Sequence, residues 1–125
     1  TGFAVASSKR NSDFHALFPS VPDDDYLIED YGCALVREVF IQGRLYVSEN
    51  HICFYANIFG WVTNIVVPFS ETVAIEKRMT ALIIPNAIQI ATLHAKHTFS
   101  SFITRDATYD LVANIWKLSH PDVPS

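Results

Sequence analysis

Residues 43–69 read GRLYVSENHICFYANIFGWVTNIVVPF, and this stretch decides the fold of the chain. Apolar residues recur at every second position before and after Glu49-Asn50. A period of two places one set of side chains on the buried face of a strand. Asn tolerates the left-handed backbone that a tight turn needs, and Gly60 marks a second break. The stretch predicts three short strands joined by two tight turns.

The second of these turns is unusually apolar, because Ile58, Phe59 and Trp61 surround Gly60. Hairpin turns normally face water and carry polar residues. A cluster of large apolar side chains at such a place needs a partner, either the core of the protein or a surface outside it. Trp and Phe suit the interface between lipid headgroups and acyl chains, so membrane insertion is one interpretation. The other interpretation is that both rings fold back onto the sheet.

Short alternating segments on both sides extend the pattern to about seven strands. Residues 27–41 are expected to be strand, with Cys33, Leu35, Val39 and Ile41 pointing inward. Val36 and Phe40 fall on the opposite parity to these four residues, and this parity change is compatible with a bulge or a bend. Further along, 87–93 and 96–102 predict a hairpin across His94-Ala95. Seven short strands with regular turns are typical of an antiparallel sandwich or open barrel.

Two helices complete the expected order of elements. Residues 9–18 predict a short helix, because Phe14, Leu17 and Phe18 share one face and Pro19 ends it. A longer amphipathic helix is predicted from Thr104 to Leu118, where it would close the open end of the barrel. We therefore expect a mainly β, pleckstrin-homology-like sandwich or barrel of seven antiparallel strands, with a C-terminal capping helix and a short N-terminal helix.

Length and charge limit the classes of function. The 125 residues fit one domain, and the net charge of −4 argues against a nucleic-acid partner. Residues 23–25 supply three of the negative charges, so a local basic face is compatible with the total. No apolar run approaches the roughly 20 residues of a membrane span. Cys33 and Cys53 are predicted to be buried free thiols.

Three longer stretches carry a family resemblance: 7–22 (SSKRNSDFHALFPSVP), 25–69, and 75–112, which contains IPNAIQI. Together they resemble a GRAM domain, and within that family the domains of the LAM/Aster sterol transporters of the endoplasmic reticulum, fungal LAM type. The motifs GRLYVSENHICFY and NIFGW are the most specific. The resemblance covers 7–118, and it implies a flexible lead over 1–8, the domain over 9–118 and a tail over 119–125.

What the resemblance implies about function is membrane docking. Such a module brings an organelle-tethered transporter to a partner membrane, while a separate StART-like domain carries the sterol and a transmembrane helix anchors the protein. We therefore expect these residues to act at the cytosolic face of the endoplasmic reticulum, at contact sites, without carrying sterol. The expected partner is an anionic or sterol-containing membrane.

The predicted site combines the apolar turn with scattered basic residues, each contributing roughly 1 kcal/mol near an anionic leaflet. The first strand turn, expected at residues 40–42, holds no Lys or Arg, which argues against tight phosphoinositide binding. For any single basic residue, a solvated surface position is the plain alternative. The predicted membrane-binding residues are Ile58, Phe59, Trp61, Arg37, Arg44, Lys77 and Arg78.

A protein-interaction module and an enzyme are the two alternative classes of function. A pleckstrin-homology-like interaction module would bind a contact-site partner protein through an open strand edge or through the apolar turn at Leu82, Ile83 and Ile84. An enzyme is not expected, because the chain has none of the motifs GxSxG, HExxH or a Gly-rich phosphate loop. His94 and His97 lack a third ligand, so no metal and no cofactor are expected.

Overall fold

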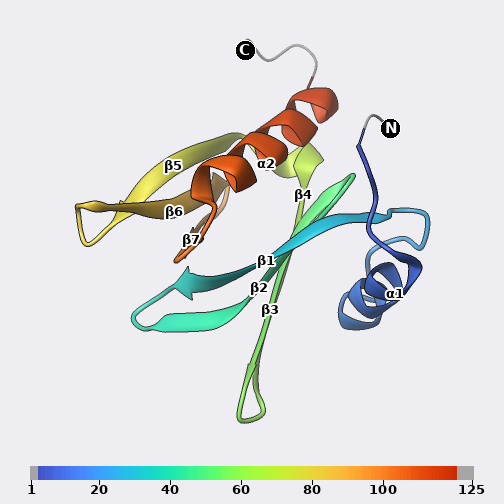
Figure 1. Ribbon diagram of the computed structural model, residues 1–125, viewed down its shortest axis with the longest axis horizontal. Helices are drawn as coiled ribbons and strands as arrows, with labels where there is room; N and C mark the ends of the chain where they lie inside the picture. The colour runs from blue at the N-terminus through green and yellow to red at the C-terminus, as the bar shows by residue number, and fades with distance from the viewer. Residues whose placement is uncertain (1–2, 121–125) are drawn as a thin grey trace.

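Seven antiparallel strands form one curled sheet in the order β4-β3-β2-β1-β7-β6-β5 (Figure 1). The computed structural model describes residues 3–120. The strands are β1 (Leu27–Val36), β2 (Phe40–Ser48), β3 (His51–Ile58), β4 (Trp61–Pro68), β5 (Ala74–Thr80), β6 (Ile84–Ala91) and β7 (Lys96–Ser100). The helices are α1 (Ser8–Leu17), the short 3-10 helix η1 (Phe69–Glu71) and α2 (Arg105–Ser119). The predicted fold class is confirmed.

The two long helices cover different faces of the sheet. Helix α2 closes one end of the curl and adds Val112 and Ile115 to the main core cluster. Helix α1 packs on the outside of the sheet, where Phe14 and Phe18 meet Cys53 in a second cluster. Neither helix within residues 3–120 is long and apolar enough to cross a bilayer.

The predicted division into a lead, a domain and a tail stays a prediction. The structure describes residues 3–8 of the predicted lead, where the Ala6 N–H donates to the Leu27 carbonyl at 2.8 Å and Phe3 packs against the core. Helix α2 ends at Ser119, and residues 121–125 of the predicted tail lie outside the described part.

The first hairpin corrects the sequence-based prediction. Strand β1 ends at Val36, and β2 begins at Phe40, so the turn is 37–39 and not 40–42. The Arg37 N–H donates to the Val39 carbonyl at 3.0 Å across this turn. The parity change therefore marks a reversal of the chain, and Val39 is 68% exposed instead of inward-facing. The prediction was wrong because the turn has no Gly, Pro or Asn and is followed by strand-favouring residues.

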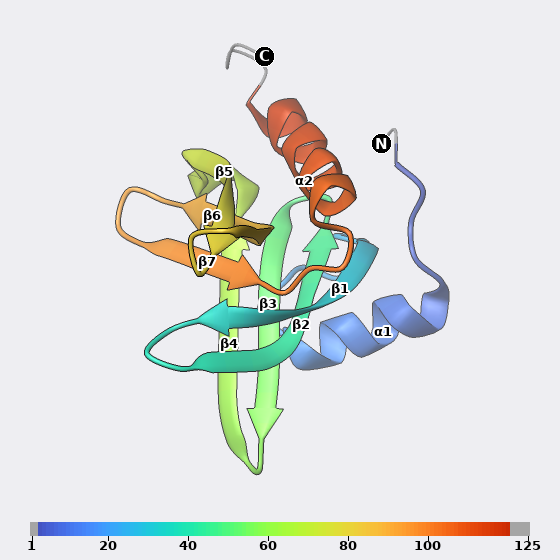
Figure 2. The ribbon, with the colours of Figure 1, turned by 60° about the vertical axis from the view of Figure 1, so that its left-hand side comes forward.

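Gly43 lies where the sheet divides into separate hairpins. The pairing of β2 with β3 begins at Arg44 and Tyr55, while β2 continues with β1 as far as Phe40. Strand β3 continues with β4 as far as Ile58, so the two hairpins point in different directions (Figure 2). A Cβ at Gly43 would lie 2.4 Å from the carbonyl oxygen of Tyr55 and 2.7 Å from Cζ of Phe54. Only glycine fits this close approach.

We expect Gly43→Ala to lower the free energy of unfolding by about 1–3 kcal/mol, because backbone and core must move to admit the methyl group. Urea unfolding followed by circular dichroism measures this change. Gly32→Ala is the matched control in β1, since its Cβ would meet only the Arg44 side chain, at 3.5 Å. Equal losses in the two variants would contradict a special constraint at Gly43.

Candidate functional site

The turn between β3 and β4 holds its aromatic residue in a strained backbone conformation. Ile58 pairs with Trp61, leaving a two-residue loop in which Phe59 has φ 53° and Gly60 has φ 87°. Positive φ at both positions defines a type I′ turn, for which Asn-Gly is the preferred sequence. The Gly60 N–H donates to Oδ1 of Asn57 at 2.8 Å, which stiffens the turn. A bulky residue in the left-handed region is unusual and costs about 1–2 kcal/mol.

The side chains of this turn point into solvent. Phe59 is fully exposed, Trp61 is 80% exposed and Ile58 is 42% exposed. The rings do not fold back onto the sheet, which was the open alternative. The protein therefore keeps a strained turn that presents an aromatic ring to the outside, where no packing inside the fold offsets the strain. Insertion of these side chains into a membrane stays a prediction.

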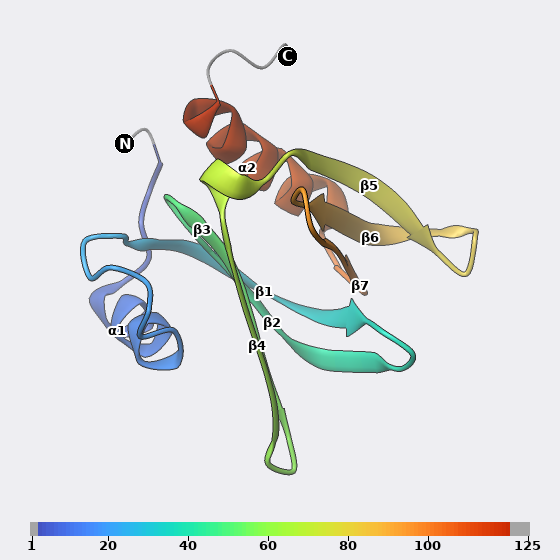
Figure 3. The same cartoon turned by 180° about the vertical axis from the view of Figure 1, so that it is seen from behind.

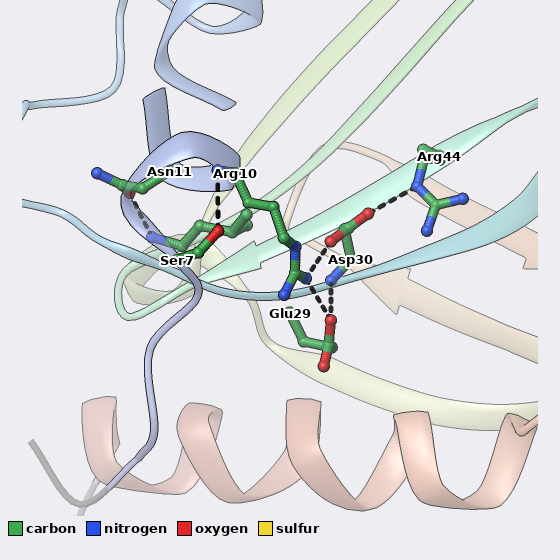
Figure 4. A network of polar contacts seen from close by, with 7 residues as sticks. Ser7, Arg10, Asn11, Glu29, Asp30 and Arg44 are labelled. Atoms are coloured by element: carbon green, nitrogen blue, oxygen red, sulfur yellow. Dashed lines mark hydrogen bonds and ion pairs between the residues drawn. The ribbon is translucent and has the colours of Figure 1, made fainter. Parts of the chain in front are cut away.

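Arg44 is held by carboxylates of the protein itself. Its Nε donates to Oδ2 of Asp30 at 2.7 Å, and Arg10 donates to both Asp30 and Glu29 (Figure 4). Burial disfavours the charged form of Asp30, but the hydrogen bonds from the two guanidinium groups outweigh it, so the pKa of Asp30 lies below its usual value. This network ties α1 to β1 and β2, and it offsets the charge that Arg44 would offer to a headgroup.

Lys77 and Arg78 are adjacent in sequence but do not form one patch. Successive residues of a strand point to opposite faces. Lys77 lies 3.2 Å from Asp106 of α2 and 5.1 Å from the centre of the Tyr109 ring. Arg78 lies on the other face and pairs with Glu76 at 3.0 Å. The structure therefore does not bring the two basic residues together, and each has an acidic neighbour.

Arg37 keeps its charge available. Within residues 3–120, no carboxylate lies within ion-pair distance of Arg37 or of Lys96, which begins β7. Nη2 of Arg37 is 3.3 Å from Nδ1 of His97. Burial, helped by the positive charge of Arg37, lowers the pKa of His97. Arg37 is thus the predicted basic residue that the structure leaves best placed to meet an anionic headgroup.

A buried polar cluster escaped the sequence analysis. Asp25 is 2% exposed, and its carboxylate lies 2.6 Å from Nδ1 of His51 and accepts from the Ser48 hydroxyl at 2.7 Å and from the Asn50 N–H at 3.1 Å. These hydrogen bonds from Asp25 therefore stabilise the turn between β2 and β3. A run of three Asp residues followed by a strand, with Ser-x-Asn-His in a later turn, was the only signal, and it does not specify the contact.

The Asp25 cluster does not activate a nucleophile. The Ser48 hydroxyl contacts the Asp25 carboxylate and the His51 carbonyl, while the His51 Nδ1 lies against Asp25, so the hydroxyl–imidazole hydrogen bond of a nucleophile–base pair is not formed. Burial first, and the charge of Asp25 second, raise the pKa of Cys53 well above its ordinary value. Burial likewise raises the pKa of Cys33 to about 12. Both cysteines are buried and free, as predicted.

Comparison with known families identifies the class of domain. The GRAM domain family matches residues 12–121, and the chain belongs to this family. The fold agrees with a pleckstrin-homology-like architecture, since the DH/PH domains of PDZ-RhoGEF align with a TM-score of 0.60 at 11% identity, over 91% of this chain and 35% of that one. The C-terminal domain of an unknown protein from Leishmania infantum aligns with a TM-score of 0.73 at 22% identity, over 84% and 95%.

Within the GRAM family the chain is similar to Aster and LAM proteins. It is 50% identical to Protein Aster-A of Homo sapiens over 87% of this chain, and 42% identical to the membrane-anchored lipid-binding protein LAM5 of Saccharomyces cerevisiae over 93%. An uncharacterized membrane protein of Schizosaccharomyces pombe is 60% identical over 97%. The chain spans only 16%, 15% and 17% of the S. pombe, Aster-A and LAM5 proteins, respectively. The predicted resemblance is confirmed.

His97 is expected to make the stability of the domain depend on pH. Because its pKa is lowered in the folded state, the unfolded chain takes up the proton first as the pH falls below about 6.5. The stability that neutral His97 contributes is present above that pH and is lost below it. Urea unfolding between about pH 7.5 and 5.5 tests this, and His97→Gln should flatten the slope. An identical slope in the variant would show that other groups carry it.

Proposed function

We propose that this domain is a non-catalytic membrane-recognition module that helps to recruit a longer, endoplasmic-reticulum-anchored sterol-transfer protein to membrane contact sites. The observation that carries the proposal is the strained turn at Phe59 and Gly60, which presents Phe59 and Trp61 to solvent. The similarity to Aster-A and to the membrane-anchored lipid-binding protein LAM5 supports a lipid surface as the partner.

The magnitudes favour apolar insertion over charge attraction. Burying a ring such as that of Phe59 or Trp61 contributes about 1.5–3 kcal/mol. A basic residue near an anionic leaflet contributes roughly 1 kcal/mol. Of the four predicted basic residues, only Arg37 has no acidic partner within ion-pair distance among residues 3–120. The headgroup contact therefore orients the domain, and the aromatic side chains supply most of the free energy of binding.

The affinity of the single domain for a membrane is expected to be low, as it is for one module of a multivalent protein. Two rings and one or two cations give weak, reversible binding, comparable to that of a single acyl chain. A module of this strength works when a second attachment raises its local concentration at the membrane. An anchored protein provides such an attachment, which is why the proposal places the domain in a tethered transporter and not in a free receptor.

Trp61→Ala is expected to weaken binding to vesicles of phosphatidylcholine and phosphatidylserine by about tenfold to a hundredfold, the equivalent of the lost ring burial. Vesicle flotation at several lipid concentrations measures the change. Leu118→Ala is the matched control, because Leu118 is similarly exposed but lies on α2, away from the turn. Binding that responds neither to phosphatidylserine, nor to sterol, nor to Trp61→Ala would refute the proposal.

The fluorescence of Trp61 offers a direct measurement of insertion. The other tryptophan, Trp116, is half-buried and donates to the Thr72 carbonyl at 2.9 Å, so Trp116→Phe leaves Trp61 as the only tryptophan. We expect its emission to shift to shorter wavelength on adding vesicles, and brominated lipids to quench it. Circular dichroism of the variant checks that the fold is retained. Emission unchanged by saturating vesicles would place Trp61 outside the bilayer.

A further inference from the structure

The turn between β5 and β6 repeats the unusual features of the turn between β3 and β4. Thr80 pairs with Ile84, and the loop between them contains Ala81 with φ 52° and Leu82 with φ 70°. The Ile83 N–H donates to the Thr80 carbonyl at 3.2 Å, which closes the loop. Leu82 is 90% exposed and Ile83 is 78% exposed. A left-handed backbone again presents large apolar side chains to solvent.

This coincidence of strain and exposure is confined to a few places. Within residues 3–120, only four residues other than glycine have positive φ: Phe59, Ala81, Leu82 and Ser101. Three of the four belong to the two apolar turns. Gly or Asn would adopt the left-handed backbone of either turn at a lower conformational free energy and would not expose a large apolar side chain. The choice of Phe in one turn and of Ala-Leu in the other therefore has no explanation in the stability of the fold.

The turn between β1 and β2 also exposes apolar side chains, although none of residues 37–40 has a positive φ. Val39 and Phe40 are 68% and 53% exposed there, next to Arg37. The three turns lie along one side of the molecule, while α2 and the two ends of the described chain lie on the other side (Figure 1). The view from behind shows the same arrangement, with the three turns spread along one margin (Figure 3). The three turns can therefore contact one flat surface at the same time, and the ends of the described chain do not lie between the turns and that surface.

From this arrangement we propose that the turns at 37–40 and 81–84 enter the same lipid leaflet as the turn at 58–61. The domain then contacts the membrane through three apolar turns. This inference rests on the proposed function and assigns a lipid contact to Leu82, Ile83, Val39 and Phe40. Three points fix the tilt of the domain, whereas one inserted turn leaves it free to pivot. Residues 3 and 120, where the described part of the chain begins and ends, then face away from the membrane.

The chemistry of the turns favours a bilayer over a protein as the occupant. Residues 57–62 and 79–85 contain no charged side chain, and 37–40 contain one Arg and one Glu. The turns therefore offer hydrocarbon contact without net charge. They also stand apart at the ends of separate hairpins (Figures 1 and 3). A fluid leaflet accepts separated side chains at any spacing, whereas a folded partner would need three matching pockets.

Polarity-sensitive labels at single positions test the inference. The variants Phe59→Cys, Ile83→Cys, Val39→Cys and Leu118→Cys of the 125-residue chain each carry one exposed thiol, since Cys33 and Cys53 are fully buried. Each labelled variant is mixed with vesicles of phosphatidylcholine and phosphatidylserine. We expect blue-shifted, brighter emission and quenching by spin-labelled lipid at positions 59, 83 and 39. The label at 118 should not respond.

The outcomes separate this inference from the proposed function. A response at 59 without a response at 83 and 39 overturns the three-point contact and leaves single-turn docking intact. Such a result would favour the alternative in which Leu82 and Ile83 bind a partner protein. No response at 59 refutes membrane docking itself, and the three-point contact with it. A response at 118 equal to that at 83 also overturns the proposed orientation.

Flotation of serine variants gives a second measurement without labels. The double variant Leu82→Ser and Ile83→Ser should weaken vesicle binding at least tenfold, because both side chains leave the bilayer. Leu118→Ser and Leu93→Ser are controls at exposed positions outside the three turns. Urea unfolding checks that the double variant is as stable as the parent chain. A loss of less than twofold in the double variant overturns the assignment of this turn to the membrane.

Discussion

The close approach of β2 to β3 at Gly43 is the constraint on which the rest of the architecture depends. A side chain there would strike the Tyr55 carbonyl oxygen and the Phe54 ring, so the two backbones meet only because the Cβ is missing. Beyond this point β2 stays with β1 and β3 stays with β4, and the hairpins separate. The separation curls the sheet around its core and leaves an end for α2 to close. It also carries the hairpin turns apart, which decides how widely the exposed apolar side chains are spread.

Two of those turns combine a left-handed backbone with exposed apolar side chains. A left-handed Phe59 and a left-handed Leu82 each destabilise the fold by a modest amount, and neither side chain gains contacts inside the protein. The basic residues show the opposite relation. Arg44, Lys77 and Arg78 are each engaged by a carboxylate of the domain, so their charges are partly offset before any lipid arrives. Under the proposed function, apolar contact is therefore the larger contribution to membrane binding, and charge is secondary.

The errors of the sequence-based prediction have particular causes. The turn at 37–39 was misplaced because it lacks the residues that usually mark turns, although the parity change beside it was a real signal. Which face of the sheet Lys77 and Arg78 occupy was left open by the sequence, and strand geometry sends these adjacent side chains to opposite faces. The contacts of the Asp25 carboxylate with Ser48 and His51 join residues more than twenty positions apart in the sequence, and no local pattern specifies such a partner.

What the sequence determined by itself was the succession of strands and helices, the membership of the GRAM family and the presence of apolar residues in the turns at 58–61 and 82–84. These follow from local periodicity and from motifs, which are written in neighbouring residues. Only the tertiary structure decided that Phe59 and Trp61 face solvent and that three hairpin turns share one side. It also decided that, within the described part of the chain, Arg37 alone of the four predicted basic residues lacks an acidic partner. Exposure, ion pairing and shared orientation depend on segments distant in the chain, and folding alone brings those segments into their relative positions.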